Sequence, residues 1–295
     1  MIEAALAASI SRATGTHYAI EAARPVGGGC IHTALALAGA RGAPRYFAKV
    51  NGAERAAMFD AEADGLEALA QAGRVRVPAV IARGKDDERA WIVLEWLDLA
   101  ALGAGAAARL GAALAAQHRE KQAHFGWARD NFIGSSPQRN GWSDDWLAFW
   151  RANRLHAQLR LAGANRLPSR MIDRGERLAA DCEVFFRGYS AGKSLLHGDL
   201  WGGNAAALAD GSPVVFDPAV HVGDREADVA MTELFGGFPP DFGSAYREAW
   251  PLDDGYRVRR DLYNLYHVLN HANLFAGGYV EQARRAIEGL LAEIA

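Results

Sequence analysis

The stretch LLHGDLWGGNAAALADGSPVVFDPAV, residues 195–220, carries the residues that decide the fold. Asp199 and Asn204 lie on a segment that must be irregular, because two glycines stand between them. The runs AAAL and PVVF are typical of short strands, and the residues ADGS between them favour a turn. We therefore expect a tight hairpin, which would bring Asp217 back beside Asn204.

Asp199, Asn204 and Asp217 together predict a site for phosphoryl transfer. One carboxylate, one amide oxygen and the phosphates of a substrate make the open oxygen coordination that Mg²⁺ prefers, so Asn204 and Asp217 are the candidate metal ligands. Asp199 would accept the proton of an attacking hydroxyl, as the Asp of the protein-kinase catalytic loop does. The alternative is that these residues only favour turns, as Asp and Asn do in ordinary loops.

Lys49 and Glu62 form a second pair of candidate site residues. Lys49 lies in the apolar run YFAKV, and Glu62 falls on the apolar stripe of the helix expected next. A carboxylate on such a face is costly unless a cation meets it, and Lys49 is the simplest partner. The pair would hold the ammonium towards the α- and β-phosphates of a nucleotide. The alternative is a lysine that extends to solvent and a half-exposed glutamate.

Two further segments are expected to contact a nucleotide. Gly27, Gly28 and Gly29 precede Lys49 between strand-like segments, where exposed backbone N–H groups can approach phosphate. Three glycines alone are weak support, because they match no established phosphate-loop spacing. The run from Glu95 through Trp96 to Leu97 would supply the hinge whose backbone hydrogen-bonds an adenine edge.

The pattern of the whole chain indicates an α+β protein with two lobes. We expect a small antiparallel-sheet N-lobe over residues 1–97 and a mostly helical C-lobe over residues 98–295, with Ser143 as the N-cap of one helix. In the N-lobe the expected strands lie within residues 24–37, 45–50, 75–80 and 91–99, and the expected helix spans residues 54–71.

Composition excludes several classes of protein. Half of the 295 residues are hydrophobic and 23% are charged, so the chain can bury a core. The net charge of -3 argues against a dedicated nucleic-acid binder. The apolar run at residues 99–108 is too short to cross a membrane, and the first residues do not resemble a secretion signal. We expect a soluble, cytoplasmic protein with no membrane partner.

With these residues identified, the chain resembles the fructosamine-3-kinase (ketosamine-3-kinase) family, a small-molecule branch of the protein-kinase-like fold related to aminoglycoside phosphotransferases. The resemblance covers about residues 24–280. It rests on GGGCIHTA (27–34), MFDAEADGLEAL (58–69), DNFIGSSPQRNGW (130–142), LLHGDLWGGN (195–204), FDPAVHVGDREADVAMTELFGGF (216–238), PLDDGY (251–256) and LYHVLNHANLF (265–275).

The resemblance implies ATP- and Mg²⁺-dependent phosphorylation of a ketosamine at its sugar O3, on a small amine or a protein. The 3-phosphate then breaks down spontaneously, so the reaction serves deglycation. By the same resemblance Asp199 is the proton acceptor, Asn204 and Asp217 hold magnesium, and Lys49 with Glu62 orients phosphate. Asp228 would brace the catalytic loop.

The acceptor pocket is expected to offer an aromatic floor to a sugar face. Trp201, beside the catalytic loop, is the candidate, and His267 and His271 are candidate partners of the sugar hydroxyls. For all three the alternative is simple packing in the core. For Cys30, in the glycine loop, the resemblance suggests redox control and a disulfide-linked homodimer. The alternative is a small residue filling a tight turn, and Cys182 is expected to pack in the core.

Other functions remain open from the sequence alone. One is a kinase for a different small acceptor, such as an aminoglycoside, choline or homoserine, although no acidic cluster for a cationic acceptor stands in residues 130–142. Another is a nucleotide-binding pseudokinase that regulates a partner, although all five candidate catalytic residues are present. A third is a metal-dependent hydrolase using His197 and Asp199, which lacks a second histidine cluster.

Overall fold

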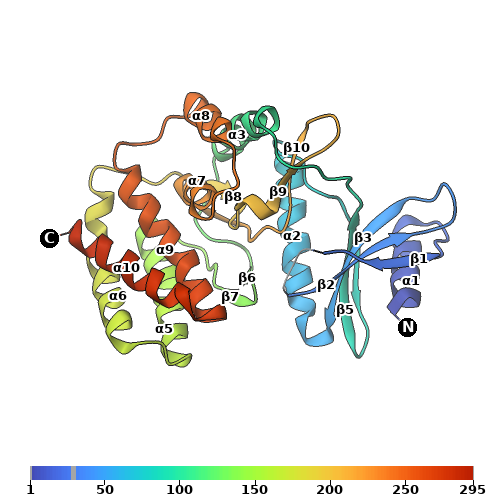
Figure 1. Cartoon of the computed structure of the whole chain (residues 1–295), viewed down its shortest axis with the longest axis horizontal. Coiled ribbons are helices and arrows are strands. Elements are labelled where there is room, and N and C mark those ends of the chain that lie inside the picture. The colour runs from blue at the N-terminus through green and yellow to red at the C-terminus, as the bar shows by residue number, and fades with distance from the viewer. Residues whose placement is uncertain (1, 28–30, 295) are drawn as a thin grey trace.

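The computed structural model of the protein describes residues 2–27 and 31–294. An antiparallel sheet lies towards the N-terminus, and most helices gather at the other end of an elongated molecule (Figure 1). No helix among the described residues is both long and apolar enough to traverse a bilayer.

The five-stranded sheet has the order β1-β2-β3-β5-β4, and every neighbouring pair is antiparallel. Its strands are β1 (Ala22–Pro25), β2 (Thr33–Ala38), β3 (Arg45–Gly52), β4 (Val80–Lys85) and β5 (Arg89–Glu95).

Alternating side chains of β5 bury both faces of the sheet. Ile92 and Leu94 pack with Phe59 and Leu66 of helix α2 (Ala56–Ala72). Trp91 and Val93 point to the opposite face and pack with helix α1 (Ile2–Thr14). Strand side chains alternate between faces, so a run that is apolar at consecutive positions is buried on both sides.

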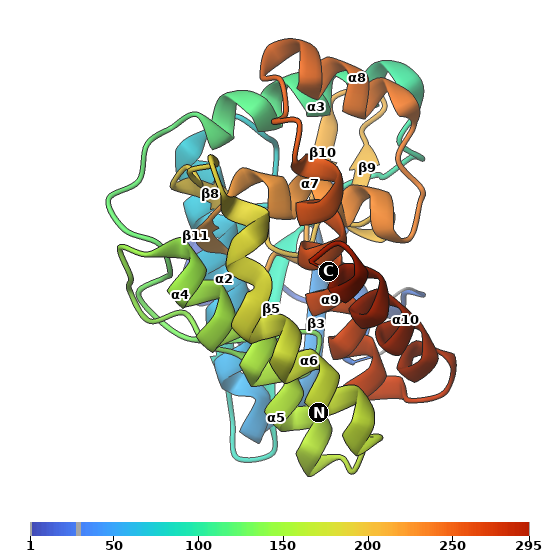
Figure 2. The same ribbon diagram turned by 90° about the vertical axis from the view of Figure 1, so that its left-hand side faces the viewer.

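The helical part packs around a second core, formed largely by α5, α6, α9 and α10, which stand together in front of the sheet in Figure 2. Trp150, Tyr263 and Leu269 are buried in this core. The helices of the helical part as a whole are α3 (Ala104–His118), α4 (Trp146–Trp150), a π-helix (Arg151–Leu155), α5 (His156–Ala164), α6 (Ser169–Asp181), α7 (Arg225–Leu234), α8 (Pro240–Ala249), α9 (Tyr256–Phe275) and α10 (Gly278–Ala292).

Three two-stranded antiparallel pairs lie between the sheet and the helices. They are β6 (Asn131–Ile133) with β7 (Ser136–Gln138), β8 (Ser194–Leu196) with β11 (His221–Gly223), and β9 (Ala205–Ala207) with β10 (Pro213–Val215). Short 3-10 helices complete the description at Ala53–Arg55, Cys182–Phe186 and Gly202–Asn204.

Several local expectations need correction. Ser143 is not the N-cap of α4: Asp145 is, and its carboxylate accepts the amide of Ala148 at 3.0 Å. The Ser143 hydroxyl instead bonds the backbone of Asp145. The strand expected at residues 75–80 begins only at Val80, because Pro78 has no N–H to donate to a ladder.

Helix α1 and the strand pairs β6–β7 and β8–β11 were not expected at all. Helix α1 covers the outer face of the sheet, and the β6–β7 hairpin interrupts the helical part. Cys182 is fully buried, as expected.

Candidate active site

A cavity of about 860 Å³ opens between the sheet and the helical part, and it brings together most of the candidate residues. Those on its wall are Gly27, Lys49, Glu62, Glu95, Trp96, Leu97, Asp199, Trp201, Asn204 and Asp217. Gly28, Gly29 and Cys30 lie outside the described residues, so the structure does not bear on their expected roles.

The β9–β10 hairpin places Asp217 beside Asn204, as the sequence predicts. Ala205 pairs with Val215, and the Phe216 amide donates to the Asn204 carbonyl at 3.1 Å. The side-chain nitrogen Nδ2 of Asn204 then lies 3.4 Å from the backbone carbonyl oxygen of Asp217. Asp217 itself has φ 56°, a left-handed conformation that Asp tolerates better than most residues and that is common at functional sites.

Lys49 joins the two halves of the site through its ammonium group. Its Nζ lies 2.7 Å from Glu62 Oε1 and 2.6 Å from Asp217 Oδ1. The lysine and Glu62 side chains are only 9% and 11% exposed, so neither extends to solvent. Burial alone would lower the pKa of Lys49, but the charges of Asp217 and Glu62 raise it above its ordinary value. The lysine is therefore a permanent cation between two carboxylates.

Asp199 lies within reach of the same groups. The Asn204 side-chain amide donates to the Asp199 carbonyl at 2.9 Å and to its Oδ2 at 3.3 Å. Burial, assisted by the nearby charge of Asp217, raises the pKa of Asp199 to about 7. A carboxylate with such a pKa can accept a proton near neutral pH, which suits it to general-base chemistry.

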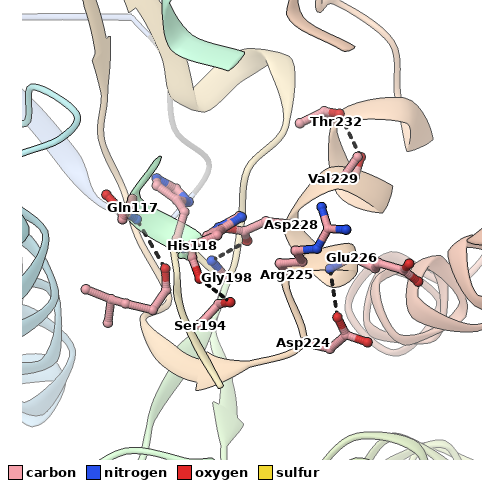
Figure 3. A network of polar contacts seen from close by, with 12 residues as sticks. Gln117, His118, Ser194, Gly198, Asp224, Arg225, Glu226, Asp228, Val229 and Thr232 are labelled. Carbon is pink, nitrogen blue, oxygen red and sulfur yellow. Dashed lines mark hydrogen bonds and ion pairs between the residues drawn. The ribbon is translucent and has the colours of Figure 1, made fainter. Parts of the chain in front are cut away.

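A buried carboxylate in α7 fixes the backbone just before Asp199 (Figure 3). Asp228 accepts the amides of His197 at 2.7 Å and Gly198 at 2.8 Å, and it also contacts His118 Nε2 at 3.2 Å. Burial would raise the pKa of Asp228, but the contact with His118 and the donated N–H groups hold it below its ordinary value.

Gly198 is needed at its position because of both space and conformation. Its φ is 82°, and a Cβ there would lie 2.1 Å from the Ala219 carbonyl oxygen.

The residues at the Glu95–Leu97 end of the cavity are placed by side-chain contacts. The Glu95 carboxylate pairs with Arg76 at 2.5 Å, and Trp96 donates to Asp98 at 2.8 Å. Phe47 is a further wall residue that was not singled out from the sequence. The sequence could have indicated Phe47, because it lies two residues before Lys49 on one strand and the two side chains therefore share one face.

The candidate acceptor residues do not all reach the cavity. Trp201 lines it and remains 40% exposed, and Phe132, another residue not singled out, lines it as well. His267 is buried in α9 away from the cavity wall, and burial lowers its pKa to about 3. His271, one turn later, is half-buried and contacts Phe235. Neither histidine therefore lines the cavity, but His271 contacts Phe235, which in turn contacts Trp201.

The donor set fits a divalent cation held partly by substrate. No cluster of three or more His, Cys, Asp or Glu side chains suited to a metal occurs in residues 2–27 and 31–294. Asn204 and Asp217 instead offer one amide and one carboxylate on adjoining backbone, within an open cavity. Mg²⁺ binds in this manner when phosphates and water complete its coordination.

Comparison with known proteins identifies the family of the chain. The sequence model of the fructosamine kinase family matches residues 2–293. A protein named probable ketoamine kinase from Synechocystis sp. is 43% identical over 291 residues, covering 97% of this chain and 96% of that protein. The chloroplastic protein-ribulosamine 3-kinase of Arabidopsis thaliana is 40% identical over 269 residues, covering 90% and 81%.

Solved structures show the same relationship. A crystal structure from Haemophilus somnus, of a protein provisionally named fructosamine-3-kinase, superposes with a TM-score of 0.89 at 28% identity and covers 97% of this chain and 96% of that one. The choline kinase of Streptococcus pneumoniae, at 15% identity and a TM-score of 0.63 over 99% of both chains, shares the protein-kinase-like α+β fold. Because the family match spans nearly the whole chain, the protein belongs to the fructosamine kinase family.

Proposed function

We propose that the protein is a kinase that transfers the γ-phosphoryl group of ATP to O3 of the sugar of a ketosamine. The observation that carries the proposal is the single charged cluster in which Lys49 contacts both Glu62 and Asp217, beside Asn204 and Asp199. The relatives named ketoamine kinase and ribulosamine 3-kinase support the choice of acceptor.

Different residues of this chain would bind the nucleotide and the acceptor. The N-lobe, residues 1–97, would hold the nucleotide through the Glu95–Leu97 hinge, the glycine loop and Lys49, which orients the α- and β-phosphates. Asn204 and Asp217 would hold Mg²⁺, which when bound neutralises charge on the phosphates. Glu62 keeps Lys49 in place through its 2.7 Å contact.

Asp199 would take the proton of the attacking hydroxyl. As O3 bonds to the γ-phosphorus, the bond from that phosphorus to the bridging oxygen breaks and ADP leaves. The hydroxyl proton passes to the Asp199 carboxylate, whose raised pKa suits it to this transfer. Positioning one hydroxyl in line with the phosphoryl group is the main demand on the site.

The acceptor would lie in the C-lobe, residues 98–295, on the side of Asp199 away from the hinge. Trp201 offers an exposed ring for the sugar face, and His271, which contacts Phe235, is the candidate histidine for a hydroxyl. Loss of the 3-phosphate from the sugar would complete deglycation in the cytoplasm.

The proposal is tested by ADP release with Mg²⁺ and ATP on four acceptors: ribulose-lysine, fructose-lysine, an aminoglycoside and choline. We expect turnover on a ketosamine, with ³¹P and ¹H NMR locating the phosphate on O3, and turnover lowered about 10²–10⁴-fold when Asp199 is replaced by Asn. Turnover on only the aminoglycoside or choline would overturn the acceptor. ATP binding without turnover on any acceptor would favour the pseudokinase instead.

A further inference from the structure

Most of the exposed large apolar side chains of the described residues lie in or next to the active-site cavity. There are six, namely Ile31, Leu99, Trp142, Trp201, Phe235 and Phe275. Ile31, Leu99 and Trp201 line the active-site cavity, and Phe235 and Phe275 continue outward from Trp201. Exposed apolar groups scattered singly need no explanation, but a contiguous set beside a cavity marks a binding surface.

The rings that extend outward from Trp201 form a continuous series. Ring centroids are 6.4 Å apart for Trp201 and Phe235 and 4.9 Å for Phe235 and His271. His271 is then 5.5 Å from Phe275 and 5.0 Å from Tyr279. We call these five residues the aromatic platform. It runs from the catalytic loop to the turn between α9 and α10.

Backbone contacts hold the platform against the catalytic loop. A Cβ at Gly202 would lie 2.9 Å from the Gly236 carbonyl oxygen and 3.0 Å from Gly237 Cα, so the segment after Phe235 touches the segment after Trp201 directly. On the other side, the tip of the β6–β7 hairpin at Gly134 meets Leu274 of α9. The α9–α10 turn lies beside that hairpin in Figure 1. The platform is therefore built from parts that are fixed relative to Asp199.

The aromatic platform extends in the direction in which the amine substituent of the acceptor would leave the cavity. By the proposed function adenine would lie at Glu95–Leu97 and the phosphates near Lys49, so a sugar that reaches Asp199 would extend past Trp201, which lines the same cavity. The substituent on its amine then leaves the cavity over Phe235 and Phe275. Aromatic faces attract a protonated amine and also bury apolar carbon. None of the five platform residues is a carboxylate.

We propose, resting on the kinase function above, that the aromatic platform binds the protonated nitrogen of the ketosamine and the apolar chain attached to it. The preferred acceptors are thus ketosamines of amines with an aliphatic or aromatic substituent, such as the butyl chain of a lysine residue. The sugar determines whether phosphoryl transfer occurs, and the platform determines which amine is favoured.

The test uses three acceptors that share the same sugar and the same charge and differ only in the amine substituent. They are the ribulosamines of methylamine, butylamine and 2-phenylethylamine. In the wild type we expect kcat/KM to rise about tenfold from the methyl to the butyl compound, because three additional methylenes become partly buried. The 2-phenylethyl compound should be at least as good. Phe235→Ala and Phe275→Ala should each reduce the butyl-to-methyl ratio about threefold to fivefold.

Trp142→Ala is the matched control. Trp142 is 55% exposed, comparable with Phe275 at 56%, but its ring contacts are with His124 and Trp127. This variant should retain the wild-type ratio. A ratio near one in the wild type, or an equal fall in Trp142→Ala, would overturn the platform. If none of the three compounds is phosphorylated, the proposed function itself fails, which is a distinct result.

Discussion

Asp228→Asn tests whether one buried carboxylate positions the catalytic loop. Asp228 is 1% exposed and accepts two backbone amides, from His197 and Gly198, in addition to its contact with His118. Asparagine has nearly the same shape, but only one of its two terminal atoms can accept a hydrogen bond. The variant must therefore turn an NH₂ group towards one of these donors.

The expected cost follows from these contacts. One buried N–H donor loses its partner, at about 1–3 kcal/mol, and the remaining hydrogen bond loses the assistance of a charge, at about 1 kcal/mol. We expect Asp228→Asn to lower the free energy of unfolding by about 2–4 kcal/mol. Domains are typically stable by only about 5–15 kcal/mol, so this loss is large. Because Gly198 directly precedes Asp199, kcat should also fall at least about tenfold.

Urea unfolding, followed by tryptophan fluorescence and by circular dichroism, measures the first effect. The control is Asp210→Asn, an exposed carboxylate that accepts one backbone amide, from Ser212 at 2.8 Å, and it should cost less than about 1 kcal/mol. If Asp228→Asn changed the free energy of unfolding by less than about 0.5 kcal/mol, at an unchanged m-value, the bracing role would be wrong.

Three further predictions concern the same site. Asp199→Asn should lower kcat about 10²–10⁴-fold, the usual contribution of a general base, while isothermal titration shows ATP binding largely retained; a kcat within a few-fold of wild type would contradict the assigned role. Because burial and Asp217 raise the pKa of Asp199 to about 7, kcat/KM for the nucleotide should fall about tenfold per pH unit below that pH, whereas a flat profile down to pH 5 would refute the raised pKa. A Cβ at Gly65 would lie 3.2 Å from Val220 and 3.3 Å from Pro218, so Gly65→Leu should reduce the free energy of unfolding by about 1–3 kcal/mol, which thermal denaturation can measure; an equal or higher Tm would show that the contact is loose.

The catalytic segment could be predicted because its geometry is local. Asn204 and Asp217 flank one short hairpin, Asp199 lies just before Asn204, and the turn chemistry of residues 209–212 indicates how the chain returns. The contact between Lys49 and Glu62 could be predicted for a different reason. Two opposite charges that are both expected in apolar surroundings should form an ion pair in any fold, because a buried charge without a partner is costly.

The acceptor side could not be predicted in the same way, because its contacts join distant parts of the chain. Asn131 of the β6–β7 hairpin donates to the Val220 carbonyl at 2.7 Å, and side-chain amide contacts of this kind leave no periodic pattern in a sequence. His267 and His271 occupy the same face of α9 by spacing alone. Only the packing of neighbouring helices decides that the first is buried and the second approaches Phe235.

Gly65 has a consequence for how the site responds to its nucleotide. It lies in α2, less than one turn after Glu62, and it allows this helix to rest directly on the segment that follows Asp217. In many protein kinases the ion pair equivalent to Lys49–Glu62 forms only when a mobile helix moves inward, and regulation controls that movement. Here the close packing of Gly65 against Pro218 and Val220 holds the helix on the opposite wall of the site, so the 2.7 Å contact between Lys49 and Glu62 needs no inward movement of the helix. Such an enzyme would be continuously active, with its rate following the supply of glycated amine.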